Sequence, residues 1–347
     1  LALASYPNFN PNDYASVENM DSFRNLAVSD AYEPGSVFKT FTLASAVDAG
    51  KISPDTTYVD TGAVSEAGFT IKNSDLKSNG LQTMTQVLEK SLNTGVIFAE
   101  KLLGNKNFSD YIERFGFGDP TEVDMFGEAQ GNINNLKNQK SDIQYFTAAF
   151  GQGITVTPIQ LVSAYNAIAS GGILYKPEIV DKIIHPDGSE ENVKPQEIRR
   201  AISTQTAYTM GNMLESVVVN GHGKRAGVPG YRVGGKTGTA QVASTTSKGY
   251  EEGKSIGSFA GFAPVDNPKY TVLIRMDDPK SVEWAESSAA PAFGELMKFL
   301  LDYGGVEPSQ SYTQKDVDVW NATHTLKQDF IKKEEEENDD KQDNKKN

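Results

Sequence analysis

The stretch Glu33-Pro34-Gly35-Ser36-Val37-Phe38-Lys39 determines how the rest of this 347-residue chain is interpreted. A proline and a glycine end an irregular segment, and apolar side chains at helical spacing follow as far as Val47, with Gly50 as a stop signal. We therefore predict a helix that begins at Ser36.

Ser36 and Lys39 form a Ser-x-x-Lys pair suited to nucleophilic catalysis. A serine at a helix N-terminus lies where unpaired backbone N–H groups and the helix dipole favour developing negative charge. A lysine three residues later shares its face, and partial burial beside another cation would leave the amine neutral enough to act as a base. The alternative is a helix-capping serine with a surface lysine. A second pair, Ser74 and Lys77, lies in a polar stretch predicted to be a loop, so context favours Ser36.

Ser91-Leu92-Asn93 is the only Ser-x-Asn in the chain. It interrupts a helical pattern that runs from Gln82 to Leu103, so we predict a turn between two helices. A hydroxyl and an amide on such a turn can relay a proton and bind an amide substrate. A turn rich in serine and asparagine also needs no function.

Lys236-Thr237-Gly238-Thr239 is the only Lys-Thr-Gly sequence, and it falls in a strand-like segment. A glycine in an edge strand lets a substrate backbone approach and pair with the strand. Lys236 can hold a carboxylate, and the Thr239 backbone N–H can face an oxyanion. The alternative is a glycine-rich strand with a solvated lysine.

The rest of the pattern predicts a helical lobe from the middle of the chain, mainly within 51–170, and a sheet lobe built from both ends. Leu1 to Ser5 is strand-like, and order should fade beyond Gly305. Further helices are expected at 109–115, 158–170, 204–219 and 290–303, and antiparallel strands at 232–243, 256–263 and 270–276.

Composition excludes several classes of function. The net charge of −13 argues against nucleic acid as a partner. The absence of cysteine excludes a thiolate nucleophile and cysteine-bound zinc. His185, His222 and His324 are isolated in the sequence, without a carboxylate at metal-ligand spacing, so we expect loop positions for them and neither a metal nor a cofactor. No apolar run is long enough to cross a bilayer.

The three motifs in this order, each in a suitable element, are the set found in penicillin-binding proteins and related β-lactamases, with Leu92 where an aspartate is usual. The chain resembles the transpeptidase domain of class B penicillin-binding proteins over roughly residues 1 to 303. The matching stretches are Leu1–Asn12, Glu33–Ser36, Phe115–Gly118, Gly151–Pro158, Phe259–Pro264 and Ala289–Phe293. The resemblance implies an α/β (α+β) fold of the penicillin-binding protein and β-lactamase type. In that fold a mainly antiparallel sheet is flanked by helices, an all-helical lobe stands beside it, and the active site lies in the cleft between them.

The resemblance also implies a peptidoglycan D,D-transpeptidase that β-lactam antibiotics acylate and inhibit. Ser36 would attack the penultimate D-Ala carbonyl of a stem peptide, with Lys39 as base, Ser91 and Asn93 assisting, and Lys236 completing the catalytic set. The substrate would bind along Thr237, Gly238 and Thr239, and the oxyanion between the backbone N–H groups of Ser36 and Thr239. Other cell-wall synthesis or division proteins are the expected partners.

The resemblance further implies domain limits and a location. We expect a transpeptidase domain at 1–305, a C-terminal extension at 306–331 and a disordered charged tail at 332–347. The chain starts as if a strand were entered midway, so we expect an upstream anchor and pedestal region that this chain lacks. The enzyme would then be held at the extracytoplasmic face of the bacterial cell membrane.

Four alternatives were weighed. Gly230–Thr237 fits the P-loop pattern and Val272–Asp277 faintly suggests its partner strand, but an apolar strand before the loop and a helix after it are lacking. A class A β-lactamase would need a Glu-x-x-Leu-Asn segment between Asn93 and Lys236, which is absent. A D,D-carboxypeptidase and a β-lactam-sensing receptor domain share all three motifs, so the motifs leave both open.

Overall fold

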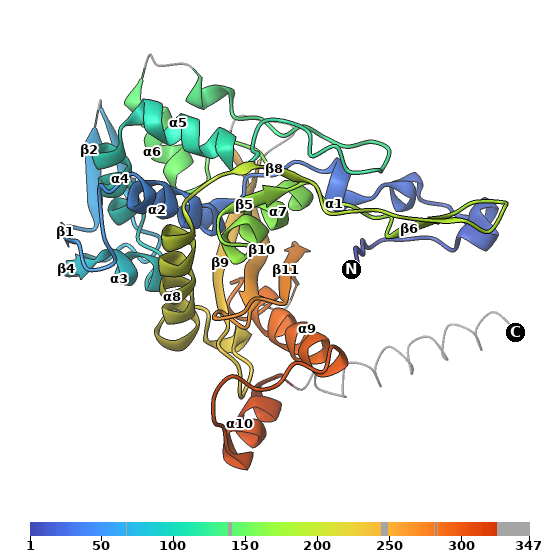
Figure 1. Ribbon diagram of the computed structural model, residues 1–347. Helices are drawn as coiled ribbons and strands as arrows, with labels where there is room; N and C mark the ends of the chain where they lie inside the picture. Colours follow the sequence, from blue (N-terminus) through green and yellow to red (C-terminus); the bar gives the residue numbers. More distant parts are fainter. Residues whose placement is uncertain (67, 138–140, 244–248, 281, 283, 325–347) are drawn as a thin grey trace, which may run out of the picture.

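The computed structural model describes residues 1–66, 68–137, 141–243, 249–280, 282 and 284–324 (Figure 1). Its main sheet has three antiparallel strands in the order β11-β10-β9, formed by Tyr270–Asp277, Tyr250–Ala263 and Gly234–Ala243. Short links join these strands in sequence, which is the feature that predicted an antiparallel sheet. The mainly antiparallel sheet flanked by helices is therefore confirmed.

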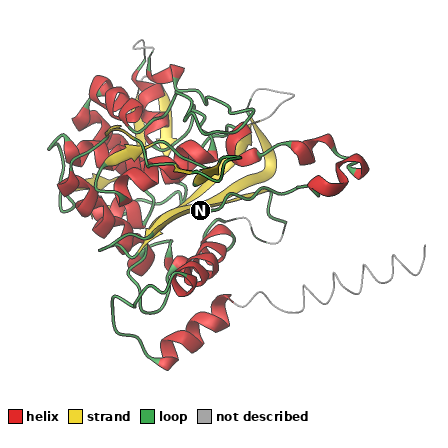
Figure 2. Ribbon diagram, turned by 45° about the vertical axis from the view of Figure 1, so that its right-hand side comes forward, coloured by secondary structure: helices red, strands yellow, loops and turns green. Residues whose placement is uncertain are grey.

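Each face of this sheet packs on helices because apolar side chains alternate along the strands. Ala260 and Phe262 of β10 belong to the larger core, together with residues of α2, α7 and α8. Phe259 and Ala263, one residue out of phase, belong to the smaller core with α9. Figure 2 shows the long strands running beside the helical cluster, with α9 at their lower end. The α-helices are α1 (Leu26–Ser29), α2 (Lys39–Asp48), α3 (Met84–Glu89), α4 (Asn93–Leu103), α5 (Asn105–Arg114), α6 (Asp142–Ala149), α7 (Pro158–Ala169), α8 (Thr204–Asn220), α9 (Ala289–Tyr303) and α10 (Gln314–His324).

Helix α2 lies at the centre of the larger core. Its residues from 39 to 46 are all buried, as expected of a helix that contacts other elements on every side. Phe41 packs against the rings of Phe115, Phe117 and Tyr165 at centroid distances of 5.0 to 5.2 Å. The helix that begins just after Ser36 is thus fixed by aromatic packing on several sides.

The helical lobe also contains strands, which corrects the expectation that it is all-helical. The segment Thr57–Asp60 alternates exposed and buried residues, a pattern that suits a half-buried strand. The short antiparallel pairs are β1 (Thr57–Asp60) with β4 (Gly80–Thr83), β2 (Ala63–Glu66) with β3 (Phe69–Lys72), β5 (Ile173–Tyr175) with β8 (Glu197–Arg200), and β6 (Lys182–Ile184) with β7 (Glu190–Asn192). The last pair extends away from the body of the molecule (Figure 1).

Two expectations about the ends of the chain are wrong. Leu1 to Ser5 forms no strand and pairs with no described strand, so the sheet is built from the C-terminal part alone. Order continues past Gly305, since α10 packs on α9 and buries His324 against Arg225 and Trp320. His324 therefore lies at a helix end and not in a loop. The charged tail at 332–347 lies outside the described residues.

Candidate active site

Ser36 lies in a short 3-10 turn, Gly35–Phe38, that leads directly into α2. The predicted helix start at Ser36 is corrected by three residues, because α2 begins at Lys39. Gly35 has a φ of +58°, and its N–H donates to Gly151 O at 3.0 Å. A side chain at Gly151 would come within 2.2 Å of Gly35 O, so two glycines allow this close crossing of the backbone. The crossing fixes the turn that carries Ser36.

Lys39 is fully buried and directed at the turn between α3 and α4. Its Nζ donates to the backbone oxygen of Ser91 and to Ser91 Oγ at 3.1 Å. Burial, and then the charge of Lys236, hold the pKa of Lys39 well below its usual range. Both effects favour the neutral amine, which is the protonation state that a base requires.

The Ser91-Leu92-Asn93 segment is the turn that its sequence predicts, between α3 and α4. Ser91 adopts a φ of +57°, a strained conformation for a residue with a side chain. Asn93 is buried, and its Nδ2 donates to Lys72 O at 2.8 Å. The backbone strain therefore falls at the residue that contacts Lys39.

Lys236 is also fully buried, on β9. Its Nζ donates to Thr237 O at 3.0 Å and to Thr237 Oγ1 at 3.2 Å. Burial lowers the pKa of Lys236 to about 7, although the charge of Glu286 acts in the opposite direction. Thr239 Oγ1 accepts a hydrogen bond from Ala285 N at 3.2 Å, which ties β9 to the loop before α9.

Gly238 brings β9 close to the Ser36 turn. A Cβ at this position would lie 2.9 Å from Val37 Cγ1, closer than real side chains come, and 3.1 Å from Pro34 O, a tight contact. The absence of a side chain thus lets the Lys-Thr-Gly strand lie against the serine.

A cavity of about 270 Å³ connects the three motifs. Its wall includes Ser36, Ser91, Thr237 and Thr239, while Lys39 and Lys236 are buried beside these residues. The remaining lining residues are Asn73, Ser74, Asp75, Lys90, His222, Trp284, Ala285 and Glu286. A larger hollow of about 530 Å³, between the β10–β11 turn and the end of α9, contains no motif residue.

Several of these lining residues were not identified from the sequence. His222 forms a 2.7 Å contact from Nδ1 to Glu286 Oε2, and the two residues are too far apart in the chain for a local pattern to reveal the pair. The loop after β3 is held by Asp60, whose buried carboxylate accepts hydrogen bonds from Asn73, Asn79 and Thr94. In the described parts of the chain, no group of three or more His, Cys, Asp or Glu residues is placed to hold a metal ion.

Comparisons with known proteins agree with this arrangement. A family model described as "Penicillin binding protein transpeptidase domain" matches residues 1–298. The chain is 38% identical over 330 residues to stage V sporulation protein D of Bacillus subtilis, covering 94% of this chain and 50% of that protein. It is 33% identical over 310 residues to peptidoglycan D,D-transpeptidase FtsI of Escherichia coli, covering 89% of this chain and 50% of that protein.

A solved structure gives the same result. Penicillin-binding protein 3 of Mycobacterium tuberculosis, complexed with aztreonam, matches with a TM-score of 0.76 and 33% identity, over 83% of this chain and 66% of that chain. The chain spans about half the length of the two curated relatives named above. Among the described residues, no helix combines the length and apolar character needed to cross a membrane.

Proposed function

Because the chain belongs to the family of penicillin-binding protein transpeptidase domains, in its class B branch, we propose that it is a serine D,D-transpeptidase that cross-links peptidoglycan stem peptides. One relative is named a peptidoglycan D,D-transpeptidase, and one structural neighbour was crystallised with a β-lactam. We extend both properties to this chain.

One observation supports the proposal most directly: Lys39, which is buried and has a lowered pKa, contacts Ser91 beside a cavity that Ser36 lines. A serine hydroxyl becomes a useful nucleophile only when a base can take its proton. Lys39 is three residues from Ser36 in the sequence and fully buried. We therefore assign it as that base.

In the proposed acylation step, Ser36 Oγ attacks the carbonyl carbon of the penultimate D-Ala while Lys39 takes the hydroxyl proton. The backbone N–H groups of Ser36 and Thr239 would stabilise the oxyanion. The amide bond between the penultimate and the terminal D-Ala then breaks. The proton that Lys39 accepted passes by way of Ser91 to the amine of the departing D-Ala. Protonated Lys236, with Thr237 and Gly238 on β9, would hold the substrate's terminal carboxylate, and Asn93 would support the binding of its amide.

In the second step an amine of a neighbouring stem peptide attacks the Ser36 ester. It loses one proton to Lys39, and Ser36 leaves with its hydroxyl restored, so a new amide bond replaces the ester. A β-lactam would enter the first step in the same way and remain as an acyl group on Ser36. No step requires a cofactor or a metal.

Water in place of the amine would make the enzyme a D,D-carboxypeptidase, and a protein that acylates without turnover would be a β-lactam-sensing receptor. Incubation of the protein with a stem-peptide or thioester donor ending in D-Ala, with and without an amine acceptor, separates the three. We expect a donor–acceptor amide that grows with acceptor concentration. Hydrolysis alone would indicate a carboxypeptidase, and a stoichiometric acyl-enzyme without turnover would indicate a receptor.

We further propose that this domain works at the extracytoplasmic face of the bacterial membrane, held by an anchor and pedestal outside the present sequence, and that other cell-wall synthesis or division proteins recruit it. Half-length coverage of the named relatives supports a larger parent protein. We keep 1–305 as the proposed transpeptidase domain and 306–331 as its C-terminal extension. Expression of the longer chain with membrane fractionation would test the anchoring.

A further inference from the structure

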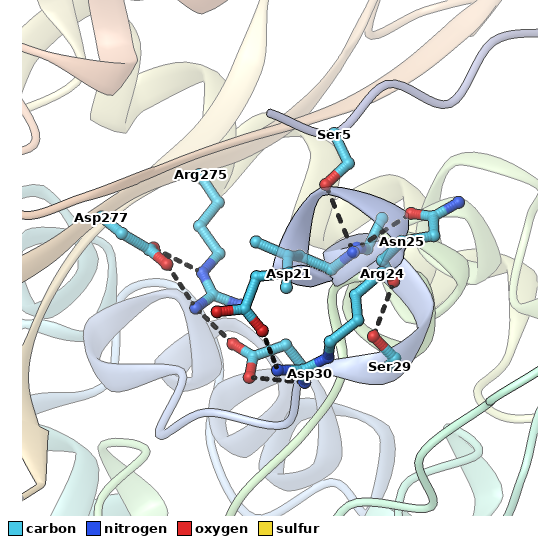
Figure 3. Close-up of polar contacts among 10 residues, drawn as sticks. Ser5, Asp21, Arg24, Asn25, Ser29, Asp30, Arg275 and Asp277 are labelled. Carbon is cyan, nitrogen blue, oxygen red and sulfur yellow. Dashed lines mark hydrogen bonds and ion pairs between the residues drawn. The ribbon is translucent and has the colours of Figure 1, made fainter. Parts of the chain in front are cut away.

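Arg275, on β11, lies outside all three motifs and yet joins the sheet to the segment that precedes Ser36. Its side chain is only 11% exposed. It donates to both carboxylate oxygens of Asp277, at 2.7 and 2.8 Å, and its Nη2 also donates to Asp30 Oδ2 at 2.6 Å. Figure 3 shows Asp30 between Arg275 and Arg24, whose Nη2 lies 4.0 Å from the other oxygen of Asp30.

Arg275 also contacts Tyr32, which lies two residues after Asp30 in the chain. The guanidinium carbon lies 4.2 Å from the centroid of the tyrosine ring, a cation–π contact in a buried setting. Asp30 and Tyr32 precede Ser36 by six and four residues. One arginine thus contacts the approach to the nucleophile at two points.

The register of the sheet connects these contacts to β9. Arg275 is directly opposite Ser258 on β10, and Ser258 is directly opposite Gly238 on β9. Residues opposite one another in antiparallel strands share a face of the sheet. Arg275 and Gly238 therefore mark the two ends of one row across the three strands.

The segment before the nucleophile, residues 30–37, runs along that row from one end to the other. At the β11 end, Asp30 and Tyr32 contact Arg275; at the β9 end, Pro34 and Val37 lie against Gly238. Gly238 is next to Thr239 in the chain. Residues 30–37 therefore lie along the face of the sheet, with Ser36 near the strand whose backbone N–H would bind the oxyanion.

On its opposite side the same segment is held by residues 151–156. Tyr32 and Val156 exchange two backbone hydrogen bonds, Gly35 N–H donates to Gly151 O, and Glu33 accepts from Gly153 N–H. These contacts belong to the loop before α7, and Glu33 contacts the sheet through Tyr250, at the other end of β10. Arg275 is therefore the charged contact between β11 and the start of the segment.

We propose that Arg275 is a positioning residue for acylation. Its contacts with Asp30 and Tyr32 set where the Ser36 turn lies relative to Thr239, and so set the distance between the attacking hydroxyl and the oxyanion donors. A displacement on the order of 1 Å between reacting groups can reduce a rate by about 100-fold, so a residue remote from the chemistry can control it. This inference rests on the proposed function of Ser36.

The test measures acylation by a fluorescent penicillin in the whole chain, separating the binding constant of the first complex from the rate constant of acylation. The variants are Arg275→Gln, Asp30→Asn and the double variant. We expect each single variant to lower the acylation rate constant by about 10- to 100-fold while binding changes by less than about twofold. Because Arg275→Gln already breaks the contact that Asp30→Asn weakens, the double variant should be no slower than the slower single variant.

Arg232→Gln is the matched control. Arg232 forms a similar forked pair with Glu215, and its side chain is 27% exposed, but the pair does not touch residues 30–37. It should lose comparable thermal stability and keep its acylation rate constant. Arg275→Lys keeps a positive charge and should recover part of the rate, although an ammonium cannot fork between two carboxylates.

An unchanged acylation rate constant in folded Arg275→Gln or Asp30→Asn would overturn the inference. So would additive losses in the double variant, or a loss confined to binding. If the Gln variant fails to fold, Arg275→Lys and Asp30→Asn still decide the question. Wild-type protein that does not acylate at Ser36 would overturn the proposed function itself, which is a different result.

Discussion

The chain contains the Ser-x-x-Lys pattern twice, and the two copies differ in structural setting and in the burial of the lysine. Ser36 and Lys39 lie at the start of a central helix, whereas Ser74 and Lys77 lie in the loop between β3 and β4. Both serines line the same cavity. Lys39 is fully buried, however, and Lys77 is exposed.

Burial of the lysine is therefore the difference that matters. Desolvation lowers the pKa of Lys39 and so favours the neutral amine that can act as a base, and the neighbouring charge of Lys236 adds to the effect. The serine of a Ser-x-x-Lys pair is thus activated by what surrounds the lysine, and proximity to the cavity is not sufficient.

The largest expected effect on the acylation rate comes from removing the amine of Lys39, with removal of the Lys77 amine as the comparison. Lys39→Met should reduce the rate of acylation by a β-lactam by roughly 10³-fold, because it removes the base while keeping a side chain of similar size. Lys77→Met should change the rate by less than about twofold, as expected for an exposed side chain remote from the chemistry. Equal rates for Lys39→Met and wild type would contradict the assignment of the base.

The next expected effect is the dependence of the acylation rate on pH, which tests the role of Lys236. Its pKa of about 7 in the free protein means that it is protonated, and able to hold a carboxylate, only below that pH. Lys39 must be neutral, which requires a pH above its own lowered pKa. The second-order rate constant for acylation should therefore fall above about pH 7, as Lys236 loses its proton. A rate that keeps rising to pH 9 would show that Lys236 does not act as a cation in binding.

Asp60 offers a way to disturb the Ser74 loop alone. Asp60→Asn removes a carboxylate that accepts hydrogen bonds from Asn73, Asn79 and Thr94, at a cost of about 1 to 3 kcal/mol in unfolding free energy. We expect substrate affinity to weaken severalfold because the cavity wall loosens, with the acylation rate constant nearly unchanged. Asp110→Asn, which breaks an exposed ion pair, is the control and should alter neither quantity. A large fall in the rate constant would show that the loop takes part in the chemistry.

The smallest expected effect on acylation concerns Glu100, a buried carboxylate that should affect stability and not catalysis. Glu100 on α4 is buried, neither carboxylate oxygen has a hydrogen-bond partner among the described residues, and burial raises its pKa to about 7. The folded protein therefore binds a proton that the unfolded chain releases above about pH 4.5, so stability falls as the pH rises from about 4.5 to 7.

Glu100→Gln should remove this pH dependence, which corresponds to an effect of about 3 kcal/mol above pH 7. Denaturant unfolding at pH 5 and pH 8 measures it, and acylation should be unaffected because Glu100 does not line the cavity. The same slope of stability against pH in the variant and the wild type would show that Glu100 is not the group responsible.

Much of the fold could be predicted because local patterns determine it. The helix from Pro158, the turn at Ser91-Leu92-Asn93 and the three C-terminal strands follow from spacing, glycine and proline signals. The strand at Leu1 to Ser5 was predicted wrongly because a strand needs a partner edge, which a local pattern cannot supply. The ordered helix α10 was missed for the related reason that its stability comes from packing on α9.

The motif residues of the candidate site could be named from the sequence, but the supporting residues could not. Asp60 gave no signal, because its role depends on donors up to 34 residues away. Arg275 was noticed only as part of a weak nucleotide-binding pattern, and its contact with Asp30 spans 245 positions. Contacts of this kind depend on the register of the sheet and on tertiary packing. No local pattern in a single sequence reveals either of these.

Peptide mapping of the protein after labelling with a fluorescent penicillin tests the central claim most directly, with Ser36→Ala and Ser74→Ala compared with the wild type. We predict that the label lies on the peptide containing Ser36, disappears in Ser36→Ala and persists in Ser74→Ala. Label that survives in Ser36→Ala, or that maps to Ser74, would contradict the account.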